Sequence, residues 1–497
     1  MNNKMFERNL PLFLSGVLGM VAFVSSWWMS SPWCDELTFL DSGVNFLRTG
    51  HWHSNVFYLV NNPLFSLAAG ASVLMFGASH QSVVFVDCLF AFLASWMILR
   101  EIRRRNLLLS LLHEILFVFL YWGGWVFSGI VLNGRPDTMT LFFTVILLAQ
   151  VFPADEWRLS LRRIFFSAFV LMLTSAYAIP LCTLVSAAGL CCKESRRVAF
   201  WRTFALVSGG VAAWFLIAAF YAFHHEAVRF LGFYAAFNTI TGERIGTLAD
   251  RALEAYTYDY TALALAISSL VAVLVIRRLR TRAHIVGAAA VLAVPFLMVC
   301  CGRYRPYYSW LFYVPSVVFA AVLCVKMGRK ISFVALAAAV VLWGAVFIRM
   351  PAGLAVRRRA VAAERFVQAH RDCLQPGSTV LVADDTMGDV SLYYPLLARK
   401  VDLWFRGKEA LTSLTDEKKF EKGLALFVKD DARRREILAK VLRYQRVMPY
   451  LPKGGFVLFT SDANREETQP LLAQAGLDLA HVASEEGYSL YRIQEPR

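Results

Sequence analysis

The stretch NLPLFLSGVLGMVAFVSSWWMSSPWCDELTFLDSGVNFLRTGHW, residues 9–52, sets the character of the chain. It opens with a mostly apolar run, residues 9–29, about as long as a helix that crosses a bilayer. Trp27, Trp28 and Trp33 then mark a membrane interface, where amphipathic aromatic rings are enriched. No small-residue cleavage site follows, so we expect an uncleaved first membrane helix and a polar loop after it.

The composition points to a membrane protein throughout. Apolar residues make up 58% of the 497 positions and charged residues 18%, against about 25% charged residues in a typical soluble protein. The net charge is +15, and 28 Lys and Arg against 16 Asp and Glu lie in residues 1–356, in short clusters between apolar stretches. This distribution argues against a nucleic-acid surface. The nine cysteines show neither metal-site spacing nor a disulfide pattern.

Apolar runs of suitable length predict eleven membrane spans. Six clusters of Lys and Arg separate them, and all six fall on one side if the spans alternate. This parity requires the region around Pro180 to cross twice and residues 63–77 not to cross. The N-terminus is then cytoplasmic and the C-terminus extracytoplasmic, and the compact loops favour a bacterial inner (plasma) membrane. The expected spans are residues 9–29, 80–99, 107–126, 136–152, 163–178, 179–191, 203–223, 261–277, 284–301, 307–325 and 331–349.

We therefore expect a mostly α fold, with a polytopic helical bundle over residues 1–350 and a soluble extracytoplasmic α/β domain over residues 351–497. Two outer loops, 30–79 and 224–260, belong to the bundle. In the C-terminal part, short β-rich runs end in polar residues and alternate with polar helical stretches. The runs are STVLVADD (378–385), GLALFVKD (423–430) and GFVLFTSD (455–462).

Eight arginines lie on the predicted outer side, where the positive-inside bias gives no reason for them. The planar guanidinium suits phosphate, and a charge beside an apolar span is usually functional or paired. The set favours an anionic ligand at the outer leaflet, whereas interfacial anchoring or local pairing, such as Arg135 with Asp137, is the alternative for each one. The eight are Arg48, Arg135, Arg229, Arg244, Arg251, Arg303, Arg305 and Arg349.

Asp35 and Glu36 stand just beyond the first span, at the start of an amphipathic stretch. A helix N-terminus stabilises ionised carboxylates, and such a carboxylate can act as general base on a hydroxyl group. Ordinary first-turn acids are the other interpretation. His51 and His53 form a His-x-His pair that could ligate a divalent metal, although interfacial or hydrogen-bonded histidines are commoner. A divalent metal is the one cofactor that the sequence raises.

Four segments in this order resemble the GT-C superfamily of membrane glycosyltransferases, and within it the protein O-mannosyltransferase and lipid A aminoarabinose transferase group. The first is the opening helix with its acidic pair. The second is similar to a His-Pro-Pro-Leu segment that runs into Phe-Gly, but reads Asn61-Asn62-Pro63-Leu64 here. The third looks like an Arg-Pro-Asp motif, and the fourth is similar to an Arg-Tyr segment before a helix with an internal proline. The last three are NNPLFSLAAGASVLMFG (61–77), NGRPDTMTLFFTVILLA (133–149) and RYRPYYSWLFYVPSVVF (303–319).

The resemblance covers about residues 9–350. It implies an inverting glycosyltransferase that moves a hexose or pentose from a polyprenyl-phosphate donor to an extracytoplasmic acceptor, which is an envelope glycolipid, a glycan or a protein. The expected partners are these two substrates and the membrane lipids, with no nucleic acid. Guanidinium groups in a low-dielectric site would stabilise the negative charge on the departing phosphate.

By this resemblance, Asp35 is the general base and Glu36 orients the acceptor or Asp35. The donor phosphate is held by Arg135, Arg303 and Arg305, and we place Tyr304 with them. We also assign substrate positioning to Asp137, Asn62 and Arg244.

Two other functions are considered. A flippase or transporter of lipid-linked sugar typically has related halves and broken helices near mid-membrane, whereas the chain has no internal repeat. A non-catalytic envelope assembly protein leaves the acidic pair and the outer arginines without a role.

Overall fold

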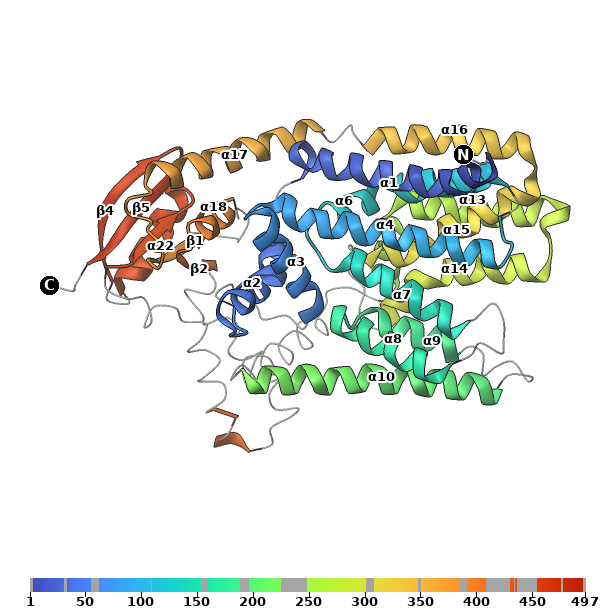
Figure 1. Ribbon diagram of the computed structural model, residues 1–497, viewed down its shortest axis with the longest axis horizontal. Helices are drawn as coiled ribbons and strands as arrows, with labels where there is room; N and C mark the ends of the chain where they lie inside the picture. The colour runs from blue at the N-terminus through green and yellow to red at the C-terminus, as the bar shows by residue number, and fades with distance from the viewer. Residues whose placement is uncertain are drawn as a thin grey trace. The chain divides into compact units, whose positions relative to one another are not determined.

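The computed structural model describes residues 3–30, 34–54, 62–108, 110–152, 160–187, 196–224, 248–300, 308–346, 350–384, 391–407, 430–432, 434–435, 454–474 and 477–494. These residues are mostly helical, with one small sheet near the C-terminus (Figure 1). The chain divides into two compact units. The first is Met1–Ser30, Asp87–Phe215 and Ile245–Pro351, and the second is Ser31–Val86, Leu216–Arg244 and Ala352–Arg497. The expected fold class, a helical membrane protein with a small α/β part, is confirmed.

The first unit consists of apolar helices. It contains α1 (Asn3–Met29), most of α4 (His80–Arg104) and most of α10 (Arg196–Phe223). Its other helices are α5 (Leu111–Trp122), α6 (Trp125–Val131), α7 (Asp137–Val151), α8 (Leu161–Thr174), α9 (Ala178–Ala187), α12 (Leu248–Thr257), α13 (Tyr260–Val275), η4 (Arg277–Leu279), α14 (Arg282–Cys300), α15 (Trp310–Met327) and α16 (Arg329–Ala345).

Five of the described helices are long and apolar enough to cross a membrane by themselves, and a sixth span results if the bent pair α12–α13 counts as one. The five lie in α1, α4, α10, α14 and α15. Several other expected spans coincide with shorter apolar helices, among them α7 and α9. The count of eleven crossings and the orientation of the termini remain predictions.

A close contact explains one break in the expected spans. The span expected at 107–126 divides into α5 and α6 at Gly123–Gly124, where a Cβ on Gly124 would collide with the ring of Tyr313. The two spans expected at 163–178 and 179–191 correspond to α8 and α9, and Tyr177 lies in the turn between them.

The second unit joins the first outer loop to the C-terminal part of the chain. It contains α2 (Cys34–Thr49), α3 (Pro63–Phe76) and most of α17 (Met350–Ala369). Helices α2 and α3 approach closely because Gly43 and Gly70 face each other: a Cβ on either would meet the backbone of the other helix. With 14 residues, α3 is about 21 Å long, shorter than the apolar core of a bilayer.

The sheet of the second unit has five strands in the order β2-β1-β3-β5-β4. Strand β1 (Thr379–Asp384) pairs in parallel with β2 (Asp402–Gly407) and β3 (Phe456–Phe459), whereas β5 (Tyr488–Gln494) is antiparallel to β3 and β4 (Asp478–Glu485). Two of the three expected strand runs, at 378–385 and 455–462, form β1 and β3. The third, at 423–430, lies almost wholly outside the described residues.

Two helices complete the described part of this unit. Helix α22 (Asp462–Gln474) packs on the sheet, with Leu472 in the core beside Leu381, Val457 and Ile493. The short helix α18 (Tyr393–Ala398) stands between β1 and β2 in the sequence and is buried at four of its six residues.

Candidate functional site

Buried carboxylates gather in pairs at two places among the described residues, Asp87 with Asp137 in the first compact unit and Glu36 with Asp41 in the second. The first cluster surrounds the start of α7 and contains Arg135 and Asp137. The second surrounds α2 and contains Glu36. We call them the α7 cluster and the α2 cluster.

Local sequence explains how α7 begins. Gly134 has a φ of +63°, which glycine adopts without strain, and Pro136 at the N-cap has a φ of −68°, the value its ring enforces. The Pro136 carbonyl accepts hydrogen bonds from the Thr140 backbone nitrogen at 2.8 Å and from Thr140 Oγ1 at 2.6 Å. This turn places the side chains of Arg135 and Asp137 at the buried start of the helix.

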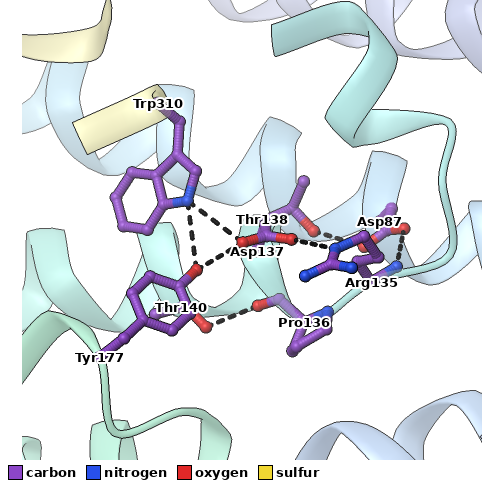
Figure 2. A network of polar contacts seen from close by, with 8 residues as sticks. All are labelled: Asp87, Arg135, Pro136, Asp137, Thr138, Thr140, Tyr177 and Trp310. Atoms are coloured by element: carbon purple, nitrogen blue, oxygen red, sulfur yellow. Dashed lines mark hydrogen bonds and ion pairs between the residues drawn. The ribbon is translucent and has the colours of Figure 1, made fainter. Parts of the chain in front are cut away.

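Asp137 is the centre of the α7 cluster, as Figure 2 shows. Its carboxylate accepts hydrogen bonds from Arg135 Nε at 2.9 Å, from the Tyr177 hydroxyl at 2.6 Å and from Trp310 Nε1 at 3.4 Å. Trp310 Nε1 also lies 3.2 Å from the Tyr177 hydroxyl oxygen. The turn between α8 and α9 and the start of α15 therefore converge on one carboxylate that is 1% exposed.

Asp87 belongs to the same cluster, and our sequence analysis did not select it. Its carboxylate accepts hydrogen bonds from the Arg135 backbone nitrogen at 3.0 Å and from Thr138 Oγ1 at 2.7 Å (Figure 2). A signal was present, because Asp87 is the single charged residue in the expected span 80–99. Ionisable residues inside such segments are rare and usually functional.

The α7 cluster combines two carboxylates with one guanidinium. Charge-assisted hydrogen bonds are about twice as strong as neutral ones, and buried charges are tolerated only when paired and hydrogen-bonded. Arg135 is 3% exposed and Asp87 is fully buried. The arrangement can hold Arg135 in one orientation.

Aromatic rings extend the α7 cluster towards the start of α15. The rings of Tyr177 and Tyr308 are stacked, with centroids 3.8 Å apart and an interplanar angle of 20°. Tyr308 is the first described residue after 301–307. The stack and the hydrogen bond from Trp310 to Asp137 thus hold residues 308–310 in place. These residues directly follow the segment that carries Arg303, Tyr304 and Arg305.

Glu36 lies in the first turn of α2 and is fully buried. Its Oε2 lies 2.7 Å from His80 Nδ1, at the start of α4, and its Oε1 accepts a hydrogen bond from the Tyr394 hydroxyl of α18. Burial and the neighbouring Glu36 carboxylate raise the pKa of the Tyr394 phenol well above its usual value. The phenol therefore keeps its proton and donates.

Asp41 is the second buried carboxylate of α2, with 4% exposure. Its Oδ1 accepts a hydrogen bond from the Tyr393 hydroxyl at 3.0 Å, and its Oδ2 accepts one from Ser54 Oγ at 3.0 Å. Arg48, two turns further along α2, donates from Nη2 to the Leu397 carbonyl at 3.2 Å. Helix α2 is thus bonded to α18 at three points.

The segment after α2 is held by aromatic packing. His224 Nδ1 accepts a hydrogen bond from the Trp52 backbone nitrogen at 3.2 Å, and the Trp52 ring packs edge-on against Phe220. His51 is exposed, and His53 Nδ1 lies 3.3 Å from the His51 carbonyl oxygen. Among the described residues, no group of three or more His, Cys, Asp or Glu could hold a metal ion, and a divalent metal stays a prediction.

The described structure accounts for part of the predicted site. Arg135 and Asp137 lie together, as the local-pairing alternative expected, and Glu36 lies in the α2 cluster. Asn62 is buried at the N-cap of α3, where its carbonyl accepts from Ser66 Oγ at 3.1 Å. Outside the described parts are the side chain of Asp35 and residues Arg244, Arg303, Tyr304 and Arg305.

Comparison with solved structures shows the fold that positions these clusters. The chain is similar to ArnT from Cupriavidus metallidurans bound to undecaprenyl phosphate, with 12% sequence identity and a TM-score of 0.62, over 97% of this chain and 98% of that one. The apo state of the same protein gives 13% identity and a TM-score of 0.59, over 97% of each chain. No family profile and no curated protein sequence matches. The resemblance predicted from the sequence is confirmed at the level of the fold, since ArnT is a GT-C lipid A aminoarabinose transferase.

Proposed function

We propose that this protein is an inverting glycosyltransferase that moves a sugar from a polyprenyl-phosphate carrier to an acceptor outside the cytoplasm. The observation that carries the proposal is the whole-length fold likeness to a protein crystallised with undecaprenyl phosphate. The α7 cluster supports it. The Arg-Pro-Asp motif, which is one of the segments that carry the family resemblance, lies there in a buried polar network.

The proposed reaction is a single displacement at the anomeric carbon. The acceptor hydroxyl oxygen forms a bond to that carbon while the bond from the carbon to the carrier phosphate oxygen breaks. Asp35 takes the hydroxyl proton as general base, and the polyprenyl phosphate leaves with the electron pair. One displacement inverts the configuration, and no nucleotide takes part.

Arginine residues stabilise the departing phosphate in this proposal. Arg135 is oriented by Asp137 through its side chain and by Asp87 through its backbone. Arg305 precedes the anchored Tyr308 by three residues, a stretch that spans at most about 11 Å. We assign Arg303, Tyr304 and Arg305 to the same phosphate on this basis, and Asp137, Asn62 and Arg244 to positioning of the substrates.

The composition of the second unit supports the proposed side of the membrane. It joins 31–86, 216–244 and 352–497. Each of these segments includes residues that lie on the outer side if the Lys and Arg clusters between the spans are cytoplasmic. Described residues of the three segments contact one another, as Trp52 does His224 and Arg48 does Leu397, so the unit is consistent with an extracytoplasmic C-terminal part. An acceptor in the cell envelope fits this topology.

The test compares envelope glycans and lipid-linked sugars by mass spectrometry in cells that lack the protein and in cells that carry it. We expect one glycan to lose a sugar when the protein is absent, and its polyprenyl-phosphate-linked donor to accumulate. Asp35→Asn at normal protein level should reproduce the loss, whereas Glu364→Gln, an exposed carboxylate of α17, should not. Full modification by Asp35→Asn would overturn the base assignment.

A second measurement separates transfer from transport. Purified protein in liposomes, given the accumulated lipid extract and the unmodified glycan, should form product and release polyprenyl phosphate. Arg303→Ala/Arg305→Ala should raise the apparent KM for the lipid donor. Movement of the donor across the bilayer without product would support a flippase instead.

A further inference from the structure

We propose that helix α18 of the C-terminal domain is a positioning element for the transfer reaction, in which Tyr393 and Tyr394 hold α2, the helix that carries Asp35. This inference rests on the proposed function, and it gives the C-terminal domain a role in catalysis. All contacts that support it lie within the second compact unit.

Three bonds join α18 to α2. The Tyr394 hydroxyl donates to Glu36, the Tyr393 hydroxyl donates to Asp41 at 3.0 Å, and the Leu397 carbonyl accepts from Arg48 at 3.2 Å. They span α2 from its first turn to its last, so they fix both the axial position and the rotation of the helix. Sequence separations of about 350 residues show that this pairing is tertiary.

Burial makes the two hydroxyls necessary. Glu36 is fully buried and Asp41 is 4% exposed, and a buried carboxylate without donors is strongly unfavourable. Both phenols are themselves buried, and burial followed by the nearby carboxylates raises the pKa of Tyr393 and of Tyr394 well above the usual value. Each hydroxyl thus remains a donor at physiological pH, and without it the buried acid loses the donor that α18 supplies, which weakens the hold on α2.

The consequence reaches the proposed base because Glu36 directly follows Asp35 in the chain. His80, at the start of α4, bonds the other oxygen of Glu36 at 2.7 Å, so this one carboxylate ties α2 to α4 and to α18. Displacing a catalytic group by about 1 Å can reduce a rate about 100-fold. We therefore class Tyr393, Tyr394 and His80 as positioning residues.

The first test measures the position of α2 without any assay of activity. Hydrogen exchange of the full-length protein in detergent is compared for the wild type, Tyr393→Phe/Tyr394→Phe and Tyr488→Phe. The control removes the hydroxyl of a buried tyrosine of the same domain, which bonds the Arg359 carbonyl of α17 at 3.5 Å. We expect amides of residues 37–49 to exchange at least about 10-fold faster in the double variant only. Unchanged exchange there overturns the proposal.

The second test uses the transfer assay described above. Tyr394→Phe should lower kcat about 10-fold and leave the donor KM within about 2-fold, and the double variant should lose more. His80→Gln, which retains a donor towards Glu36, should keep more activity than His80→Ala. A loss confined to KM, or normal kcat in the double variant, overturns the positioning role. If the wild type transfers no sugar, the proposed function fails while the exchange experiment still decides whether α18 holds α2.

Discussion

The α7 and α2 clusters neutralise buried carboxylates by different means. In the α7 cluster, Asp137 pairs with the permanent cation of Arg135. In the α2 cluster, fully buried Glu36 bonds the neutral phenol of Tyr394 and the imidazole of His80. Asp137 is thus held mainly by an ion pair, whereas Glu36 is held by hydrogen bonds and by the packing of its neighbours.

The comparison has an energetic consequence. Removing one member of a buried ion pair leaves an uncompensated charge and is strongly destabilising, by about 3–5 kcal/mol. Neutralising a carboxylate held by hydrogen-bond donors leaves no orphan ion, so the loss is close to that of the hydrogen bonds, about 1–2 kcal/mol. The α7 cluster should therefore tolerate loss of its cation poorly, whereas the α2 cluster should tolerate loss of its negative charge.

The largest expected effect is that of Arg135→Gln. The substitution leaves Asp137 and Asp87 buried without the side-chain cation, and we expect the free energy of unfolding to fall by about 3–5 kcal/mol. Thermal unfolding of the purified protein in detergent measures the change as a lower apparent Tm. Sugar transfer should be lost as well, if the proposed function holds.

A matched control and a second variant sharpen this prediction. Arg104→Gln removes an exposed arginine that bonds Glu101 at 3.0 Å, and it should change stability by less than about 1 kcal/mol. Adding Asp137→Asn to Arg135→Gln should restore part of the loss. An additive effect of the two substitutions would mean that charge pairing does not hold this cluster together.

Asp259 extends the comparison to a buried carboxylate with fewer donors. It lies between α12 and α13, before the expected span 261–277, and it is 1% exposed. Its Oδ1 caps α13 through the Ala262 nitrogen at 3.0 Å, whereas its Oδ2 is buried without a hydrogen-bond partner among the described residues. Burial raises the pKa of Asp259 to about 6, against the opposing effect of the backbone hydrogen bonds.

The raised pKa gives Asp259→Asn a pH-dependent effect. Folding favours the protonated acid, so its contribution is present below the unfolded pKa of about 4 and is lost as pH rises through about 6. At pH 7.5 the ionised group therefore destabilises the fold, and Asp259→Asn should raise stability by about 3 kcal/mol. At pH 4.5 the gain should fall to about 1 kcal/mol. Glu254→Gln, at an exposed position of α12, should show no such dependence, and an equal gain at both pH values would contradict the assignment.

Local sequence patterns predicted most of the helices and strands. They also selected Arg135 and Asp137 of the α7 cluster and Glu36 of the α2 cluster. Apolar runs predicted most helices, and the Arg-Pro-Asp tripeptide brought Arg135 and Asp137 together because residues two apart at a helix start are neighbours. The break at Gly123–Gly124 was missed, since the apolar pattern continues through it. A division beside Tyr177 was expected, because residues 163–178 and 179–191 were predicted as separate spans.

The remaining partners could not be read from the sequence. Trp310 and Tyr177 bind Asp137 across large sequence separations, and a chain with 18 Tyr and 13 Trp gives no local reason to select these two. Tyr393 and Tyr394 lie about 350 residues beyond the acids they bind. Hydrogen bonds of this kind are set by tertiary packing and not by periodicity.

The smallest expected effect is that of Glu36→Gln, and it is the one that most directly tests the contrast between the clusters. The amide keeps the shape of the side chain and an oxygen acceptor, and it leaves no unpaired ion, so stability should fall by only about 1 kcal/mol. Glu36→Ala removes the acceptor of the hydrogen bonds from His80 and Tyr394 and opens a cavity, and it should cost several times more. Thermal unfolding at pH 7.5 compares the two variants with the wild type. If Glu36→Gln destabilised the protein as much as Arg135→Gln, the α2 cluster would also be held by charge, with a protonated His80 as the cation left behind.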